Sequence, residues 1–149
     1  MTAYELVIEA LIARQKAYTP YSNHGVGAAI KCADGKVYTG CNIENAAYGP
    51  TICAERTAIF KAVSEGEREF EEIAIVGGIN DRDELDMCAP CGVCRQVMME
   101  FANPDKFRIV LAAIKNAKNI ENITEEDVQI KVYTLKELIP LGFGPANLN

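Results

Sequence analysis

The chain has 149 residues, of which 49% are hydrophobic, and it carries 15 Lys and Arg against 21 Asp and Glu. A chain of this length buries about 68–70% of the surface that its unfolded form exposes, so we expect residues 1–149 to form a single domain. The net charge of −6 would repel a phosphate backbone, which argues against polymeric nucleic acid as a partner and favours a small uncharged ligand. Neither a signal-like start nor an apolar run of about 18 residues is visible, so we expect no membrane association and a cytoplasmic protein.

The first part of the chain predicts a helix followed by a β-hairpin. Thr2-Ala3-Tyr4-Glu5 matches a capping box, and apolar residues then recur at helical spacing, so we expect a helix that runs to about Tyr18. Two β-like runs, 26–32 and 36–43, are joined by Ala33-Asp34-Gly35, whose Asp-Gly pair is typical of a tight turn. We therefore expect these strands to be antiparallel neighbours.

Helices and strands alternate through the rest of the chain. Strand pairs separated by helices indicate an α/β fold, here a three-layer α/β/α domain with a mixed sheet of about five strands. Segments 80–86 and 116–127 are polar, and we expect them to be irregular. The remaining predicted elements are a helix over 53–64, a strand over 73–77, a helix through 91–101, strands over 108–114 and 128–133, and a short helix opened by Thr134.

Three cysteines at two predicted helix starts are candidate metal ligands. Cys91 and Cys94 are three residues apart, so on a helix they lie on one face and could bind one ion, and Pro90 suits a first helical position. A catalytic zinc ion uses three protein ligands and leaves the fourth place for water. Cys53, at the start of the other helix, is the best placed third ligand. The partial positive charge of a helix N-terminus favours thiolates at both places.

Three charged residues indicate that such a site would be catalytic. Glu55 lies two residues after Cys53, where its carboxylate could take a proton from a zinc-activated water and deliver it again. Three thiolates would leave zinc with a net negative charge and make it a poor Lewis acid. We expect Arg56 and Arg95 to offset this by donating hydrogen bonds to the thiolates.

Other interpretations of the cysteines remain open at this point. A C-x-x-C pair also occurs in redox dithiols and structural zinc sites, and Cys88 could close the coordination shell as a fourth ligand. Six cysteines are enough for disulfides, although a reducing cytosol weighs against them.

The residues around these cysteines resemble those of a known enzyme family. Segments 53–57 (CAERT) and 90–96 (PCGVCRQ) are similar to the small, homotetrameric cytidine deaminases that bind zinc through cysteines alone. The similarity extends to Tyr21-Ser22 and to segments 26–29, 40–46 and 141–145, so it spans nearly the whole chain. The fold expected from the residues is then the cytidine deaminase-like one.

The resemblance implies a zinc hydrolase that converts cytidine or 2′-deoxycytidine to the uridine nucleoside and ammonia in pyrimidine salvage. It implies that Cys53, Cys91 and Cys94 bind Zn²⁺ and that an activated water attacks C4 of the cytosine ring. Glu55 would protonate N3 of the ring and then the departing amine.

The resemblance also implies how the nucleoside is bound. Asn42 and Glu44 would hold the ribose hydroxyls, and the backbone of Ala54 would contact the base edge. Phe143 matches an aromatic residue that a neighbouring subunit places over the base, and Tyr48 is expected to contribute to the same interface. A homotetramer with shared active sites follows from this implication.

One residue departs from the family pattern. His24, the only histidine of the chain, occupies the position where the family usually has a phenylalanine packed against the nucleoside. In the pocket it would add a hydrogen-bonding group and a charge that changes between about pH 5 and 8. A surface or strand-edge histidine is the plain alternative. The preference among cytidine, deoxycytidine and a modified cytosine nucleoside is therefore open.

Three rival functions differ in what they require of the sequence. A deaminase of another aminated heterocycle, such as an antibiotic nucleoside, would use the same zinc chemistry, but the ribose-binding pair argues against it. A non-catalytic zinc-stabilised interaction module would use Cys88 as a fourth ligand. Base editing in RNA or DNA is disfavoured by the acidic charge and by the lack of a basic, aromatic-interleaved stretch.

Overall fold

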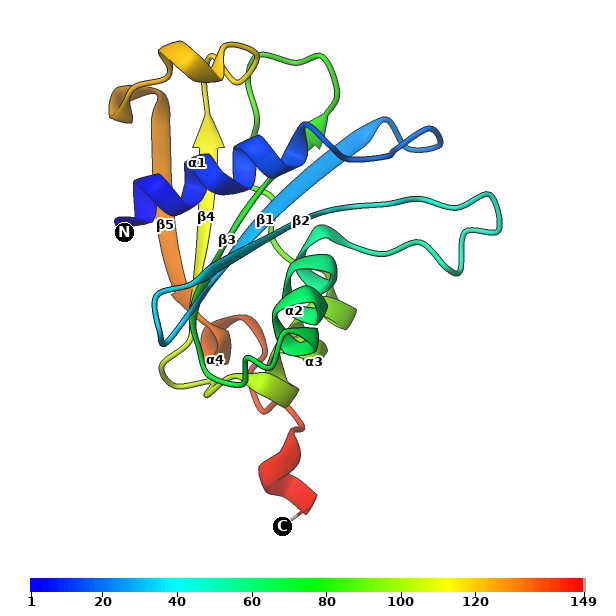
Figure 1. Ribbon diagram of the computed structural model, residues 1–149, viewed down its shortest axis with the longest axis vertical. Helices are drawn as coiled ribbons and strands as arrows, with labels where there is room; N and C mark the ends of the chain where they lie inside the picture. The colour runs from blue at the N-terminus through cyan, green and yellow to red at the C-terminus, as the bar shows by residue number, and fades with distance from the viewer. Residues whose placement is uncertain (149) are drawn as a thin grey trace.

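A five-stranded mixed β-sheet forms the middle of the structure, a computed structural model that describes residues 1–148 (Figure 1). The strands lie in the order β2-β1-β3-β4-β5, and only the β3–β4 pair is parallel. The antiparallel β1–β2 hairpin confirms the prediction from Asp34-Gly35. The strands are β1 (His24–Cys32), β2 (Val37–Cys41), β3 (Phe70–Ile79), β4 (Arg108–Ile114) and β5 (Val128–Thr134).

Helices cover both faces of this sheet, which confirms the predicted three layers. Helix α1 (Ala3–Arg14) packs on one face, and helices α2 (Ala54–Ser64) and α3 (Gly92–Phe101) pack on the other. Successive residues of a strand point to opposite faces, so Ile75 joins the core under α2 and α3 while Val76 joins the core under α1. A short helix, α4 (Leu135–Leu138), follows β5.

The boundaries of several elements differ from the predicted ones, and three of these differences bear on the site. Helix α1 ends at Arg14, not near Tyr18, because the Tyr18 N–H donates to the carbonyl oxygen of Asn42 and forms an isolated bridge beside the hairpin. Strand β3 is longer than the apolar run 73–77. Helix α3 begins at Gly92 with Cys91 as its N-cap, so Pro90 lies before the helix and not at its first position.

Glycines allow two helices to approach the sheet backbone closely. A methyl group on Gly27 of β1 would lie 1.9 Å from the Ala10 carbonyl oxygen of α1. A methyl group on Gly40 of β2 would lie 2.5 Å from the Ala58 backbone nitrogen of α2. Any side chain at either position would push its helix away from the sheet. Gly40 therefore sets how close α2, which carries Glu55, lies to the sheet.

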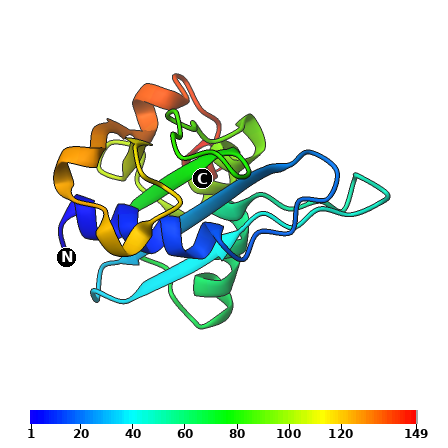
Figure 2. The ribbon, with the colours of Figure 1, turned by 90° about the horizontal axis from the view of Figure 1, so that it is seen from above.

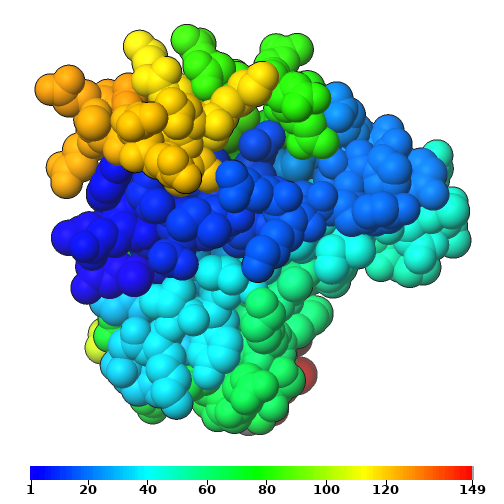
Figure 3. All heavy atoms as spheres, turned by 45° about the horizontal axis from the view of Figure 1, so that its top comes forward, coloured from blue at the N-terminus to red at the C-terminus, as the bar shows by residue number. Residues whose placement is uncertain are grey.

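The two polar segments pair with one another at one end of the sheet. The Ala117 N–H donates to the Asp83 carbonyl oxygen, and Leu85 and Ile114 exchange both backbone hydrogen bonds. Figure 3 shows these segments, yellow and green, next to the blue surface of α1. Segment 116–127 contains two short 3₁₀ turns, Ile120–Asn122 and Glu125–Asp127, where the sequence predicted only irregular structure.

Two segments extend from the body of the molecule. The turn-rich connection between β2 and α2 projects outward in both ribbon views (Figures 1 and 2). The chain after α4 leads to a final 3₁₀ turn, Pro145–Leu148, at the bottom of Figure 1. Within residues 1–148, none of the helices has the length and apolar character needed to cross a bilayer.

Candidate active site

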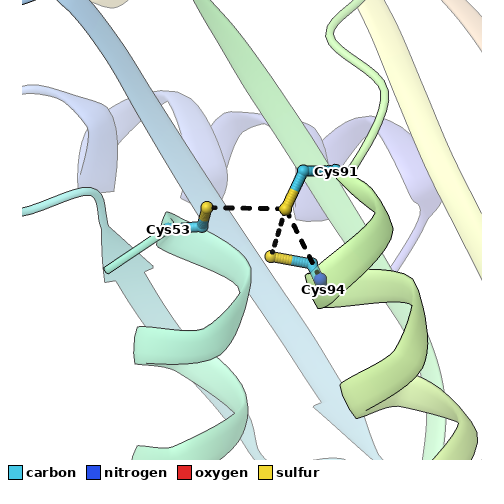
Figure 4. Close-up of side chains that lie close together, drawn as sticks. All are labelled: Cys53, Cys91 and Cys94. Carbon is cyan, nitrogen blue, oxygen red and sulfur yellow. Dashed lines mark hydrogen bonds between the residues drawn. The ribbon is translucent and has the colours of Figure 1, made fainter. Parts of the chain in front are cut away.

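Three thiols from two helix starts meet in one cluster. Cys53 is the N-cap of α2, and Cys91 and Cys94 lie at the start of α3. Their sulfur atoms all lie within 4.8 Å of one another, with 3.7 Å between Cys53 and Cys91 and 3.4 Å between Cys91 and Cys94 (Figure 4). The structure therefore brings together the three cysteines that the sequence grouped.

The cluster has the dimensions of a zinc site. A zinc–sulfur bond is about 2.3 Å long, so thiolates at the corners of a tetrahedron lie about 3.8 Å apart. The sulfur distances of 3.4 and 3.7 Å come close to that spacing. Cys94 is fully buried, whereas Cys91 is exposed, so one side of the cluster is accessible from outside. Three thiols with an accessible side fit a catalytic zinc ion better than a closed structural one.

Arg56 donates a hydrogen bond to one of these thiols. Its Nη2 lies 3.3 Å from the Cys53 sulfur. A hydrogen bond from Cys94, together with Arg56 and Cys91, lowers the pKa of Cys53 against the effect of burial. The Arg56 Nε is buried and has no hydrogen-bond partner. The guanidinium thus favours a thiolate at Cys53, as the sequence predicted for Arg56.

Glu55 is buried next to the thiols. It has 4% of its surface exposed. Burial raises the pKa of its carboxyl above the usual value, and the nearby Cys53 adds to this shift. A carboxyl group with a raised pKa gains and loses a proton more readily near neutral pH, as an acid/base group requires. Its position beside the cluster fits the predicted proton carrier.

Arg95 lies in a different place from the one that we predicted. Its Nε donates to the Pro90 carbonyl oxygen at 2.8 Å, and its Nη1 donates to the Leu138 carbonyl oxygen at 2.6 Å. Within residues 1–148, Arg95 donates no hydrogen bond to a cysteine sulfur, so the prediction that it does is wrong. Arg95 instead ties the segment before α3 to the end of α4.

Cys88 lies close to the cluster but does not belong to it. Its sulfur is not among the three that lie within 4.8 Å of one another. Burial raises the pKa of its thiol to about 11, with smaller effects from Glu55 and Cys53. A neutral thiol outside the group of three is a poor fourth ligand, so the structure does not support a closed four-thiolate shell.

Asn42 and Glu44 are both held by the segment that precedes and opens β1. The Asn42 Oδ1 accepts from the Val26 N–H at 2.8 Å, and its Nδ2 donates to the His24 carbonyl oxygen at 2.9 Å. The Glu44 Oε1 accepts from the N–H groups of Tyr21 and Ser22 at 3.0 and 3.1 Å. The side-chain and backbone hydrogen bonds of Ser22 lower the pKa of Glu44, so this carboxylate is charged and fixed.

His24 is the first residue of β1 and lines a cavity of about 260 Å³. The cavity lies between the sheet, where His24 pairs with Ile79, and segment 82–88, which includes Cys88. His24 is half-buried, so it is both a strand-edge residue and a cavity-lining one. None of Cys53, Glu55, Asn42 and Glu44 lines this cavity, so a place for His24 in the nucleoside pocket stays a prediction.

The other predicted substrate-binding residues are spread over the molecule. Ala54 is completely buried at the first turn of α2, next to Glu55. Tyr48 is 70% exposed on the projecting connection, and its ring makes an edge contact with Tyr21. Phe143 is 56% exposed on the segment after α4, where its carbonyl oxygen accepts from Gln96.

Sequence reasoning gave no role to two residues near the site. The Ser22 Oγ accepts from the His24 N–H at 3.1 Å, and Asn80 contacts the same turn from the end of β3. The contacts of Asn80 could not be found by spacing, because its side-chain partners lie 55 or more residues away.

Comparison with known proteins identifies relatives of this chain. Residues 2–111 match the family model described as the cytidine and deoxycytidylate deaminase zinc-binding region. A cytidine deaminase of Sporosarcina psychrophila is 52% identical over 100% of this chain and 96% of its own. A blasticidin-S deaminase of Bacillus cereus is 34% identical over 74% of this chain and 78% of its own.

The solved structures agree with the sequence comparisons. The crystal structure of a cytidine deaminase from Burkholderia pseudomallei is 43% identical, covers 96% of this chain and 100% of its own, and superimposes with a TM-score of 0.78. The matched region includes all three clustered thiols, Glu55 and Arg56. The chain therefore belongs to the cytidine and deoxycytidylate deaminase family.

Proposed function

We propose that this protein is a zinc-dependent hydrolase that deaminates cytidine and 2′-deoxycytidine to the uridine nucleosides and ammonia. The observation that carries the proposal is the cluster of three thiols with the buried Glu55 beside it. The full-length similarity to a protein named cytidine deaminase supports the same activity. Cys53, Cys91 and Cys94 would hold the zinc ion.

Bound zinc supplies Lewis-acid chemistry, which makes the attacking water more acidic. Glu55 takes one proton of that water and delivers it to N3, while a bond forms between the water oxygen and C4 of the cytosine ring. Glu55 then takes the remaining proton from the C4 hydroxyl group and delivers it to the amine, the C4–N4 bond breaks as the C4 carbonyl forms, and ammonia leaves. Arg56 withdraws charge from the Cys53 sulfur through its 3.3 Å contact.

Asn42 and Glu44 are proposed to bind the sugar hydroxyls, and the Ala54 backbone to bind the base. The fixed, charged carboxylate of Glu44 is suited to accept hydrogen bonds from hydroxyl groups. His24 is proposed to line the nucleoside pocket, supported by the hydrogen bond that its carbonyl oxygen accepts from the Asn42 Nδ2 at 2.9 Å.

The aromatic groups that would cover the base are proposed to come from neighbouring subunits of a homotetramer. The large exposed fractions of Tyr48 and Phe143, 70% and 56%, support this part of the proposal. Sedimentation velocity tests the tetramer directly, and a monomer would contradict it. We also place the activity in pyrimidine salvage in the cytoplasm, where a reducing environment keeps the thiols free.

The test is ammonia release on adding cytidine to the zinc-loaded protein, with Glu55→Gln as the matched variant. We expect the wild type to release ammonia and the variant to release it about 10²–10⁴-fold more slowly. Glutamine keeps the size of the side chain but cannot take up and deliver a proton. Ammonia release that is equal in both would contradict the role of Glu55. No release from cytidine or deoxycytidine while zinc is bound would overturn the function.

A deaminase of a modified cytosine nucleoside is a second candidate. The observation that favours it is His24, whose carbonyl oxygen accepts a hydrogen bond from the proposed sugar-binding Asn42, together with the 34% identical relative named blasticidin-S deaminase. Blasticidin S assayed beside cytidine separates the two candidates. A higher kcat/KM for cytidine supports the first.

A further inference from the structure

Asn80 is the first residue after β3, at the start of the acidic segment 80–86, to which no function was assigned from its residues. It makes three hydrogen bonds to residues 19–25, which comprise the turn before β1 and the first two residues of that strand. Its backbone N–H donates to the Asn23 carbonyl oxygen at 2.8 Å, its Oδ1 accepts from the Gly25 N–H at 3.1 Å, and its Nδ2 donates to the Thr19 Oγ1 at 2.9 Å. The backbone N–H and both polar atoms of the Asn80 side chain therefore hold residues 19–25 in place.

Residues 19–25 form a turn that needs such support. Asn23 has a φ of 56°, in the left-handed region that side chains other than glycine rarely adopt. The Thr19 side chain is buried, with 8% of the residue exposed, so its hydroxyl gains most of its partners from within the protein. A methyl group on Gly25 would lie 2.7 Å from the Asn80 Oδ1, so only glycine lets Asn80 approach this closely.

The same turn holds the Glu44 carboxylate. The N–H groups of Tyr21 and Ser22 that donate to Glu44 lie in the middle of the turn. Ser22 connects them to β1, because its Oγ accepts from the His24 N–H. Asn42 contacts the next residues through His24 and Val26. A change in the turn therefore changes where Glu44 points, whereas the thiols lie on α2 and α3 and are held separately.

We propose that Asn80 is a positioning residue for sugar recognition, because it fixes the turn 19–25 whose backbone orients Glu44. This inference rests on the proposed function, in which Glu44 binds the sugar hydroxyls. Asn80 touches neither substrate nor zinc in this role, and it acts through the turn. The acidic segment 80–86 thus begins with a residue that serves the active site.

The test compares kcat/KM for cytidine with kcat/KM for 2′,3′-dideoxycytidine, which lacks the 2′ and 3′ hydroxyls of the sugar. The ratio of the two values reports hydroxyl recognition, whereas a loss of folded or zinc-loaded enzyme lowers both values equally. We expect Asn80→Ala to reduce the ratio about fivefold, the effect of roughly one lost hydrogen bond. The change should appear in KM for cytidine, with kcat and zinc content within about twofold of the wild type.

Two variants serve as controls for Asn80→Ala. Asn80→Asp keeps an acceptor for the Gly25 N–H and accepts from the Thr19 hydroxyl, so it should restore the ratio. Asn103→Ala removes a comparable bond, from the Asp105 N–H to the Asn103 Oδ1 at 3.0 Å, in a turn with no contact to residues 19–25. It should leave the ratio unchanged.

A double-mutant cycle assigns the effect to Glu44. In a Glu44→Gln background, Asn80→Ala should reduce the ratio no further, because both changes act through the same carboxylate. An unchanged ratio in Asn80→Ala, or an equal loss in both backgrounds, overturns the inference. If Asn80→Ala does not fold, Thr19→Val removes only the hydroxyl that Nδ2 contacts and should lower the ratio about twofold; no change there also overturns it.

The activity of the wild type on cytidine distinguishes a failure of the role of Asn80 from a failure of the proposed function. If it deaminates cytidine and Asn80→Ala keeps the wild-type ratio, only the role of Asn80 is wrong. If it releases no ammonia from cytidine, the proposed function fails and this inference fails with it.

Discussion

The Nη2 of Arg56 lies 3.3 Å from the sulfur of Cys53, three residues earlier at the N-cap of the same helix. The start of α2 therefore presents a candidate zinc ligand, the proposed acid/base group and a cation side by side, with Glu55 between the other two. The second arginine beside the cysteines, Arg95, bonds only backbone oxygens among its recorded partners. Mutation of Arg56 and mutation of Arg95 should therefore have different effects.

Arg56→Gln should impair the metal centre. Loss of the guanidinium removes a donor that favours the Cys53 thiolate, and changes of this kind typically cost about 10–100-fold in metal affinity or activity. Zinc affinity by competition with a chromogenic chelator, and kcat on the zinc-loaded protein, measure the effect. Zinc affinity and kcat within twofold of the wild type would contradict it.

Arg95→Gln should instead lower stability. It leaves the carbonyl oxygens of Pro90 and Leu138 without their donor, which costs about 1–3 kcal/mol in a partly buried place. Thermal unfolding measures the loss. Zinc affinity should stay near the wild-type value, and a variant of normal stability with weak zinc binding would show that Arg95 acts on the thiolates after all.

Gly40→Ala should disturb the site from the sheet side. The added methyl group would meet the Ala58 nitrogen at 2.5 Å and the Ala54 carbonyl oxygen at 2.7 Å, both backbone atoms of α2. The helix that carries Glu55 must then shift, and overpacking of this kind costs about 1–3 kcal/mol. Lower thermal stability together with lower kcat is the expected result.

Gly92→Ala is the matched control for Gly40→Ala. A methyl group on Gly92 would have no atom within 4 Å, and α3 begins at this residue. Alanine is a better helix former than glycine by about 1 kcal/mol, so this variant should be at least as stable as the wild type. Equal damage from both substitutions would show that close packing at Gly40 is not the cause.

Local patterns predicted most of the elements, because local interactions decide them. The Thr2 side chain accepts from the Glu5 N–H in a complete capping box, and Thr134 opens α4 in the same way. Asp34-Gly35 predicted the hairpin correctly. Helix α1 nevertheless ends four residues early, since Tyr18 bonds to Asn42, a partner distant in sequence that no local pattern contains.

The site was predictable to the extent that its groups are close in sequence. Cys91 and Cys94 are three residues apart, and Glu55 follows Cys53 by two, so residue type and spacing were enough to find each pair. The two predicted helix starts and the resemblance to the family then joined the pairs. The direction of Arg95 was not predictable, because its partner Leu138 lies 43 residues away. The exclusion of Cys88 from the thiol cluster likewise depends on tertiary packing.

The stability contributed by Glu44 should depend on pH. The hydrogen bonds of Ser22 and Tyr21 lower the pKa of the folded carboxyl below its ordinary value of 4.5. A carboxyl with a lowered folded pKa stabilises the protein above the unfolded pKa, and this contribution is lost as the pH falls through the folded pKa. Glu44→Gln should therefore unfold at a lower temperature than the wild type at neutral pH. The difference should shrink below about pH 4.5, and a difference that is constant with pH would contradict the assignment.

Zinc content should depend on three cysteines and not on the fourth nearby. Cys53→Ser, Cys91→Ser and Cys94→Ser each remove one of the sulfur atoms that lie within 4.8 Å of one another, so each variant should lose most of its zinc. Cys88→Ser should retain as much zinc as the wild type, because its sulfur lies outside that group and its thiol pKa is raised to about 11. Zinc per chain, measured by atomic emission after dialysis, checks all four variants.

Removing zinc with a chelator should lower the unfolding temperature of the wild type and of Cys88→Ser by the same amount, because metal binding to the folded state stabilises it. Loss of zinc from Cys88→Ser would instead indicate a closed four-thiolate site, and the catalytic interpretation of the open one would fail.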